Sequence, residues 1–544
     1  MGNRKNKFII TLTGPSACGK SYLIEYICTL GEELGFKPKI LPKYVTRSPR
    51  ASELRDQKMG KELEIIPVPK IPEECEYRYQ MYGKQYGFDR DAVRAMLEEG
   101  LSPIIVVNEV RVVEELKRDF KDQVLSLFVF RSVPRLETFE QEAQKRGVTA
   151  IEEIQERLSK SIAIYRTYVA HIALFNRVIL NPPRRPDQED YAKTQIKNVL
   201  EGVLKEKIPL SRPDPSKPKL FIIAGNAASG KDEIIRAVND MGKRQAKIIR
   251  KYTSRRKDED DGEEMICKDI PRLDKLEEFG RAYQAEVEEH QRLAAERNAA
   301  AGEDTEKLVE LQSRNLREER EILTAEERFW QTYYDTREQK LRERICCETS
   351  GNADVRSLRR EIEEQIHDAF FMRNEEYIDL EKIREGDRFA SKRKVSRVKY
   401  RNRGYVFYEN NATLYGFEIY NSPRNAGTLL REMEKQNKHA VLVASLVEIF
   451  DIVRPLMDGN IVTIFSYSEI SADEFEKHSK AGTADKKMTS FEAAIKEYSD
   501  EIVNFDHVTL FAESELGKRN SVREEELIDQ MFRLFRHYLP AVAN

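Results

Sequence analysis

The sequence FIITLTGPSACGKS, residues 8–21, decides the fold, because it joins an apolar run of strand length to a glycine-rich loop and a helix-like stretch. Residues 14–21 fit the pattern GxxxxGK[ST]. In such a loop the backbone amides surround phosphate oxygens, and the N-terminus of the following helix favours an anion. We therefore predict an ATP-binding loop formed by Gly14, Ser16, Cys18, Gly19, Lys20 and Ser21, with Lys20 on the β and γ phosphates and Ser21 on Mg²⁺.

A second sequence of the same plan, LFIIAGNAASGKD, occupies residues 220–232. It keeps Gly225, Gly230 and Lys231 as candidate ATP-binding residues, but Asp232 replaces the hydroxyl that would bind magnesium. A carboxylate at this position either binds the metal directly or repels the nucleotide. At about 4 Å and an effective dielectric near 20, one unit of repulsion is worth roughly 4 kcal/mol. We therefore expect the second loop to be a damaged site.

Other segments recur in the same order, which predicts two copies of one domain plan. The pairs are PKYVTRSPR (42–50) with RKYTSRRK (250–257), YQMYGKQYGFD (79–89) with YENNATLYGFE (408–418), PIIVV (103–107) with AVLVA (440–444), and FNRVILN (175–181) with FDHVTLF (505–511). The stretch between the copies is rich in proline and charge, as in an exposed connector. The predicted organisation is a first half at residues 1–204, a linker at 205–218 and a second half at 219–544.

A long insertion, about residues 271–403, distinguishes the second half. Residues 272–345 contain no proline and are dense in Glu, Arg, Ala, Gln and Leu, which predicts helices, with a hairpin turn at residues 299–304. Apolar side chains recur every seven residues at Val309, Leu316, Leu323 and Trp330. Residues 272–345 could therefore form a dimer or bind a protein partner as a coiled coil, but a surface helix packed on its own domain is favoured.

Composition narrows the class of protein further. In 544 residues, 92 Lys and Arg nearly balance 95 Asp and Glu, so net charge gives no reason to expect a nucleic acid or a membrane as an obligatory partner. Six cysteines without a CxxC pair, and no signal-peptide core at the N-terminus, predict a cytoplasmic protein without disulfides or zinc. The basic stretch at residues 388–403 could bind nucleic acid, but its VSRVKY segment alternates like a strand, and the strand is favoured.

A charged loop follows the first glycine-rich loop and predicts a site for a second phosphate. Arg47 and Arg50 are three residues apart, and Glu53 follows after three more. Arginines bind phosphate oxygens in a forked geometry, and the glutamate can order them. Together with the YG segment at residues 86–87 and the later strands, these motifs resemble those of the guanylate kinase family. The resemblance covers essentially residues 5–200 and, in the second half, the two ends around the insertion.

The resemblance implies an α/β fold with parallel sheets flanked by helices, nucleotide at the carboxyl ends of the strands, and ATP- and Mg²⁺-dependent phosphorylation of a monophosphate. By position it implies acceptor-site roles for Lys43, Arg47, Arg50, Glu53, Tyr86, Asn108, Arg255 and Tyr415. It implies catalytic roles for Lys20, Lys145, Arg146 and Arg157, which neutralise the phosphoryl group in transit. In the second half Glu263 and Glu264 also match fragments of the acceptor site.

Several positions depart from the family pattern. Lys43 stands where the family has a serine facing guanine, and Tyr77 stands where it has a glutamate, although Glu76 is one residue away. Guanine recognition is therefore in doubt, and the acceptor could be another nucleoside monophosphate or a sugar phosphate. In the second half Ser445 replaces the strand carboxylate, which predicts a pseudokinase or regulatory domain. The rival hypothesis is a nucleotide-binding scaffold without turnover that recruits a partner through the helical insertion.

Overall fold

The computed structural model describes residues 7–15, 18–49, 65–81, 83–131, 151–182, 188–210, 217–225, 229–240, 246–249, 251–253, 265–267, 378–384, 395–400, 403–410, 413–419, 437–444, 460–468, 486–511 and 520–538, with scattered residues of 289–315, 431–436 and 449–457. The chain divides into two compact units. One contains residues 1–247, 437–447 and 460–544, and the other contains residues 248–436 and 448–459. The predicted domain boundaries stay a prediction.

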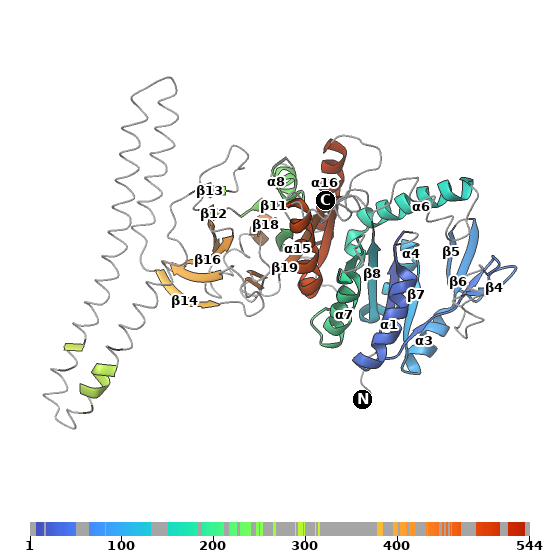
Figure 1. Cartoon of the computed structure of the whole chain (residues 1–544), viewed down its shortest axis with the longest axis horizontal. Coiled ribbons are helices and arrows are strands. Elements are labelled where there is room, and N and C mark those ends of the chain that lie inside the picture. Colours follow the sequence, from blue (N-terminus) through green and yellow to red (C-terminus); the bar gives the residue numbers. More distant parts are fainter. Residues whose placement is uncertain are drawn as a thin grey trace, which may run out of the picture. The chain divides into compact units, whose positions relative to one another are not determined.

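The first compact unit contains a parallel sheet with the strand order β2-β7-β1-β8-β9 (Figure 1). Its strands are β1 (Ile9–Thr13), β2 (Pro38–Ile40), β7 (Ser102–Val106), β8 (Val124–Phe130) and β9 (Arg177–Leu180). Every residue of β1 and β8 is buried, as expected for central strands covered on both faces. The predicted strand at residues 8–13 is therefore confirmed, and so is the α/β fold class.

Helices flank this sheet and connect its strands. They are α1 (Lys20–Leu34), α3 (Arg90–Glu98), α4 (Val110–Phe120), α6 (Ile151–Ala170) and α7 (Tyr191–Leu204), with short 3-10 turns η2 (Lys121–Gln123) and η3 (Ile172–Leu174). Glycines in the left-handed region flank α1, with φ of 101° at Gly19 and 74° at Gly35. Asp89 accepts a hydrogen bond from the Asp91 amide at the start of α3, so it caps that helix.

A four-stranded sheet follows the order β4-β3-β6-β5 and carries the YG segment. Its strands are β3 (Lys43–Val45), β4 (Ile65–Pro67), β5 (Tyr77–Met81) and β6 (Lys84–Phe88). Strands β5 and β6 form an antiparallel hairpin in which Tyr79 pairs with Tyr86. The two rings stack with centroids 5.2 Å apart, and both are buried in a core shared with β1, β7 and α4. The hairpin is thereby fixed against the parallel sheet.

A second parallel sheet in the same compact unit has the order β11-β18-β10-β19-β20, which corresponds strand for strand to the first. Its strands are β10 (Leu220–Gly225), β11 (Ala246–Ile248), β18 (His439–Val443), β19 (Ile461–Ser468) and β20 (His507–Phe511). Its helices are α8 (Lys231–Asp240), α15 (Lys486–Glu501) and α16 (Asn520–Tyr538), with the 3-10 turn η4 (Ile502–Asn504). The strand predicted at residues 220–224 is confirmed by β10.

The two parallel sheets share side-chain arrangements as well as strand order. Phe128, Tyr168 and Phe175 form a ring cluster on the first sheet, with centroids 4.4 to 5.7 Å apart. The second sheet has the cluster Phe465, Tyr498 and Phe505, with centroids 4.7 to 5.6 Å apart. In both sheets a buried glutamine, Gln195 or Gln530, exchanges two hydrogen bonds with the backbone of the last strand, at Leu180 or Leu510.

The second compact unit holds a six-stranded sheet of order β13-β12-β17-β16-β15-β14. Its strands are β12 (Lys251–Thr253), β13 (Met265–Cys267), β14 (Ile378–Arg384), β15 (Val395–Tyr400), β16 (Arg403–Asn410) and β17 (Thr413–Ile419). The VSRVKY segment is strand β15, as predicted. Most of residues 272–345, including residues 300–304 of the expected hairpin turn and all four heptad positions, lie outside the described residues.

A buried histidine makes the stability of the second sheet depend on pH. His439 accepts a hydrogen bond at Nδ1 from the Lys219 amide, and its Nε2 lies 3.0 Å from the Phe535 carbonyl, so the neutral ring carries its proton on Nε2. Burial lowers the pKa of His439 to about 4. Between pH 6.5 and 4 the imidazole binds a proton in the unfolded chain but not in the folded one. Lowering the pH through this range therefore lowers the free energy of unfolding, by up to about 3 kcal/mol.

The midpoint of urea unfolding should be lower at pH 4.5 than at pH 7. We expect this drop to be much larger for the native protein than for His439→Gln. The glutamine keeps an acceptor and a donor but does not titrate. An equal fall in both proteins would show that His439 does not carry this dependence.

Candidate functional site

The first loop, residues 14–21, lies at the carboxyl end of β1 and leads into α1. Close packing fixes its path. A Cβ atom on Gly14 would lie 2.4 Å from the Val129 carbonyl oxygen, and one on Gly19 would lie 2.6 Å from Asn181 Nδ2. With φ of 101°, Gly19 also adopts a backbone conformation that other residues rarely take. Glycine is therefore required at both positions, as in a loop that wraps phosphate oxygens.

Lys20 begins helix α1 and folds back over the first loop. Its Nζ lies 2.7 Å from both the Gly14 and the Pro15 carbonyl oxygens. The ammonium group is thus placed above the loop, where it can contact a phosphate without leaving the helix N-terminus. Ser21, the next residue, is exposed on α1, so its hydroxyl is available to a metal ion. The arrangement fits the phosphates of ATP, and Lys20 and Ser21 are the residues that would hold ATP and Mg²⁺.

Two asparagines connect the first loop to neighbouring strands. Asn108, just beyond β7, accepts a hydrogen bond from the Gly14 amide at 3.0 Å, and its Nδ2 lies 3.7 Å from Met81 Sδ on the YG hairpin. Asn181, just beyond β9, donates to the Cys18 carbonyl at 2.8 Å. Asn108 was predicted as an acceptor-site residue, and it joins the loop to the smaller sheet. Asn181 was missed, although it ends a segment that recurs along the chain.

The smaller sheet brings two predicted acceptor-site residues close together. The Thr46 amide donates to the Gln85 carbonyl at 3.1 Å, and the Gln85 amide donates to Thr46 Oγ1 at 3.0 Å. The register pairs Val45 with Tyr86, so Arg47, two residues beyond the end of β3, lies diagonally across from Tyr86. Arg47 Nη1 donates to the Ser48 carbonyl at 3.1 Å. Tyr86 is buried against Tyr79, so only its position near the Arg47 loop, and not an exposed phenol, is in keeping with the predicted acceptor site.

The positions that depart from the guanylate kinase pattern have structural roles here. Tyr77 is 1% exposed, and its hydroxyl donates to Asp119 at 2.9 Å. Burial, followed by the bond with Asp119, raises the pKa of Tyr77. Lys43 Nζ donates to the Val106 carbonyl at 2.6 Å, and Glu76 accepts from the Arg90 amide at the start of α3. Each of these three side chains therefore has a partner within the fold.

The second loop, residues 225–232, resembles the first at its glycines and its lysine. Gly225 and Gly230 have φ of 151° and 86°, and Lys231 Nζ donates to the Gly225 carbonyl at 2.9 Å. A Cβ atom on Gly225 would lie 2.2 Å from the Ser466 carbonyl oxygen. The glycines and the lysine are thus placed as in the first loop. Residues 226–228 and the side chain of Asp232 lie outside the described residues.

Several predicted site residues also lie outside the described residues. They are Ser16, Arg50, Glu53, Lys145, Arg146, Arg255, Glu263, Glu264 and Ser445. The backbone of Arg157 belongs to helix α6 and that of Tyr415 to strand β17, but their side chains are not described. Their roles therefore stay predictions.

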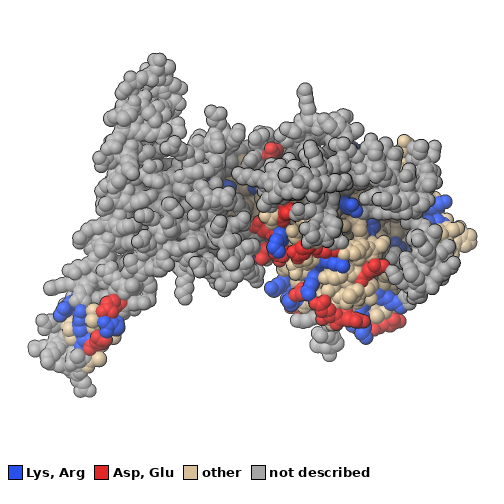
Figure 2. Space-filling model, in the orientation of Figure 1, with Lys and Arg blue, Asp and Glu red and all other residues tan. Residues whose placement is uncertain are grey.

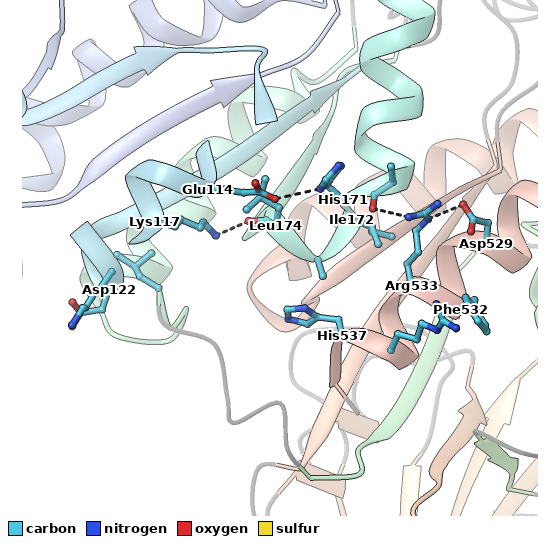
Figure 3. Close-up of a pocket in the computed structure, with 15 residues that line it drawn as sticks. Glu114, Lys117, Asp122, His171, Ile172, Leu174, Asp529, Phe532, Arg533 and His537 are labelled. Carbon is cyan, nitrogen blue, oxygen red and sulfur yellow. Dashed lines mark hydrogen bonds and ion pairs between the residues drawn. The ribbon is translucent and has the colours of Figure 1, made fainter. Parts of the chain in front are cut away.

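A cavity of about 910 Å³ lies away from both loops, between α4, η3 and α16 (Figure 3). The C-terminal ends of α4, α6 and α16 lie at it, and such ends favour cations. Lys117 donates to the Leu174 carbonyl at 2.5 Å, and Arg533 donates to the Ala170 carbonyl at 3.3 Å and pairs with Asp529 at 2.8 Å (Figure 3). These cations complement backbone carbonyls and a carboxylate, so the cavity does not define an anion site.

Basic and acidic side chains alternate over the described part of the face in Figure 2, in keeping with a net charge of −3. Among the described residues, no group of three His, Cys, Asp or Glu side chains could hold a metal ion. Within the same residues, no helix is both long and apolar enough to cross a lipid bilayer.

The fold is α/β, and a glycine-rich loop joins β1 to α1 at the carboxyl end of the first parallel sheet. No protein-family model matches the chain. Over 197 residues it is 23% identical to a guanylate kinase of Psychrobacter arcticus, a match that covers 35% of this chain and 85% of the relative. Among solved structures, a guanylate kinase of Anaplasma phagocytophilum matches at 16% identity over 36% of this chain and 85% of its own, with a TM-score of 0.22. The chain is thus similar to guanylate kinases over about a third of its length, at low identity.

The packing around Gly19 leads to a prediction with a matched control. Gly19→Ala places a methyl group against Asn181 at a positive φ, whereas Gly35→Ala introduces the same kind of backbone strain with no atom within 4 Å. Each alanine should cost about 1–2 kcal/mol of stability. Only Gly19→Ala should also weaken ATP binding, by about tenfold or more, because the loop must move away from Asn181. Equilibrium nucleotide binding to both variants checks this, and an equal loss in Gly35→Ala would contradict it.

Proposed function

We propose that the first half of the chain is an ATP- and Mg²⁺-dependent phosphotransferase that acts on a nucleoside monophosphate or a related phosphate monoester. The observation that carries this proposal is the first loop, in which Lys20 lies over the Gly14 and Pro15 carbonyls at the carboxyl end of β1. A side chain on Gly14 or Gly19 would lie too close to neighbouring atoms, and Asn108 and Asn181 are hydrogen-bonded to the loop backbone. The similarity to a guanylate kinase over 197 residues supports the same activity class.

Within this mechanism the protein positions two phosphate groups and neutralises their charge. Lys20 and the amides of the first loop bind the β and γ phosphates, and Ser21 binds the metal ion. Magnesium, when bound, offsets negative charge on the transferred group. Arg47, Arg50 and Tyr86 bind the acceptor phosphate, and Glu53 orders the two arginines. Lys145, Arg146 and Arg157 stabilise the phosphoryl group in transit.

The acceptor is read by its phosphate more than by a guanine base. Tyr77, at the position of the family's glutamate, is buried and bonded to Asp119. Lys43 is bonded to the backbone at Val106, and Glu76 caps α3. Tyr77 and Lys43 are thereby engaged within the fold, and one oxygen of the exposed Glu76 carboxylate is bonded to the backbone at the start of α3. We therefore propose an acceptor other than guanosine monophosphate, such as another nucleoside monophosphate or a sugar phosphate.

We propose that the second half is a second copy of the same domain. In this copy rapid phosphoryl transfer has been lost, and the domain serves as a pseudokinase or regulatory domain. The matching strand order of the two parallel sheets supports the duplication. Asp232 at the metal-binding position and Ser445 at the strand carboxylate position support the loss of transfer.

The test is an acceptor screen. The full chain is incubated with ATP, Mg²⁺ and each of a panel of nucleoside monophosphates and sugar phosphates, and ADP release and the phosphorylated product are measured. At least one acceptor should give product well above background hydrolysis, with guanosine monophosphate not the best. ATP binding without product from any acceptor would overturn the proposal.

A further inference from the structure

Two buried tyrosines connect the two parallel sheets in a reciprocal way. Tyr168 of α6 donates its hydroxyl hydrogen to the Val508 carbonyl of β20 at 2.6 Å. Tyr498 of α15 donates to the Val178 carbonyl of β9, also at 2.6 Å. Both tyrosines are fully buried. Tyr168 and Tyr498 each precede by seven residues the phenylalanine of their own ring cluster, so the two contacts are related by the internal repeat.

The accepting carbonyls belong to edge strands. Strand β9 is the last strand of the first sheet, and β20 is the last strand of the second. The two edges contact each other but do not pair as strands. A buried carbonyl without a hydrogen-bond donor destabilises the folded state. The tyrosine hydroxyls supply donors to carbonyls on the edge strands that strand pairing does not satisfy. We call this region, defined by Tyr168, Val178, Tyr498 and Val508, the joint.

Several further hydrogen bonds at the joint are donated by the first sheet and its helix α7. Arg177, 5% exposed, donates to the Ile502 carbonyl at 3.1 Å and the Val503 carbonyl at 3.0 Å. Gln195 donates to Ser499 Oγ at 3.0 Å, and Asn198 donates to the Ser499 carbonyl at 2.8 Å. Charged and buried donors of this kind fix a contact more firmly than surface ion pairs do.

Helix α6 links the joint to the proposed phosphotransfer site. Tyr168 lies in its last turn, and Arg157 lies eleven residues earlier, about 16 Å along the same helix. The ring of Tyr168 packs against Phe128 of the first sheet at 4.4 Å, while its hydroxyl reaches the second sheet. Helix α16 of the second sheet also contacts α6, and Arg533 donates to the Ala170 carbonyl (Figures 1 and 3). The second sheet therefore fixes the C-terminal end of α6.

We propose that Tyr168 is a positioning residue through which the second sheet holds helix α6, and with it Arg157, in place for phosphoryl transfer at the first loop. This inference rests on the proposed function. It gives the second half a regulatory role that needs no nucleotide in the second loop.

The test uses the full chain and three conservative variants. Tyr168→Phe removes the hydroxyl at the joint but keeps the ring that packs on Phe128. Tyr498→Phe removes the reciprocal hydroxyl, which belongs to α15. Tyr538→Phe is the matched control, because its buried hydroxyl lies 2.8 Å from His507 Nε2 within the second sheet and its helix α16. Amide hydrogen exchange in α6 and α15 and, with the best acceptor, kcat and KM are measured for all four proteins.

We expect Tyr168→Phe to raise exchange rates in α6 about tenfold and to lower kcat by a similar factor, with the KM for ATP unchanged. Tyr498→Phe should loosen α15 and leave α6 as it is, and Tyr538→Phe should change neither helix. Unchanged exchange in α6 of Tyr168→Phe, or equal loosening by Tyr538→Phe, would overturn the role of the joint whether or not the protein is active. Looser α6 with an unchanged kcat would overturn positioning for transfer. An inactive native protein would overturn the proposed function, and the exchange comparison would still decide whether the second sheet holds α6.

Discussion

Lys20→Ala should lower phosphoryl transfer by about a hundredfold to a thousandfold, which corresponds to roughly 3 to 4 kcal/mol of transition-state stabilisation. The ammonium group lies 2.7 Å from two carbonyl oxygens of the first loop, and under the proposed function this is where negative charge develops on the phosphates. Alanine removes that charge without altering Gly14 or Gly19. The measurement is the initial rate of ADP release with the best acceptor, at saturating ATP and Mg²⁺.

The matched control is Lys231→Ala. Lys231 makes the corresponding contact in the second loop, 2.9 Å from the Gly225 carbonyl oxygen, so this variant removes the same chemical group from the other site. Under the proposed function it should keep nearly the full rate, within about twofold. A native rate in Lys20→Ala would refute the catalytic assignment of the first loop. A similar loss in both variants would instead show that the second loop takes part in turnover.

Much of the fold could be predicted from local sequence, because its signals are local. The apolar runs that became β1 and β10 each end in a glycine loop, and strand β15 shows the alternation expected of a strand. Both loops have the glycine conformations that their pattern requires, with φ of 101° at Gly19 and 86° at Gly230. Pattern and spacing were sufficient here, since neighbours in sequence make these structures.

The contacts that brace the site could not be predicted in this way. Asn181 reaches Cys18 from a strand 163 residues later, and Tyr168 reaches Val508 across 340 residues. Nothing in the local sequence distinguishes these side chains from other buried polar groups. Glu76 is the opposite case, because its sequence position suggests a role in base recognition. In the structure its carboxylate accepts a hydrogen bond from the first amide of α3. Long-range partners of this kind depend on strand order, which the recurring segments indicate only indirectly.

Asp232→Ser should raise the affinity of the second loop for MgATP by about tenfold to a hundredfold. The described glycines and lysine of this loop match those of the first, with left-handed Gly230 and Lys231 folded onto the Gly225 carbonyl, so we attribute the expected weak binding to Asp232. Unscreened, a unit charge 4 Å from the nucleotide would cost roughly 4 kcal/mol, and solvent reduces that figure. The change is made in Lys20→Ala, so that binding at the first loop is weakened, and is measured by equilibrium titration with MgATP.

Asp232→Asn is the control that separates repulsion from a missing ligand, because it removes the charge without supplying a hydroxyl. If repulsion limits binding, asparagine should recover most of the affinity gained with serine. If the metal needs a hydroxyl ligand, serine alone should recover it. A loss of affinity in both variants would mean that the Asp232 carboxylate itself binds the metal, and the second loop would then be a working nucleotide site that uses a different ligand. In that case the charge at this position would favour the bound nucleotide, and Asp232 would no longer support the loss of turnover in the second half.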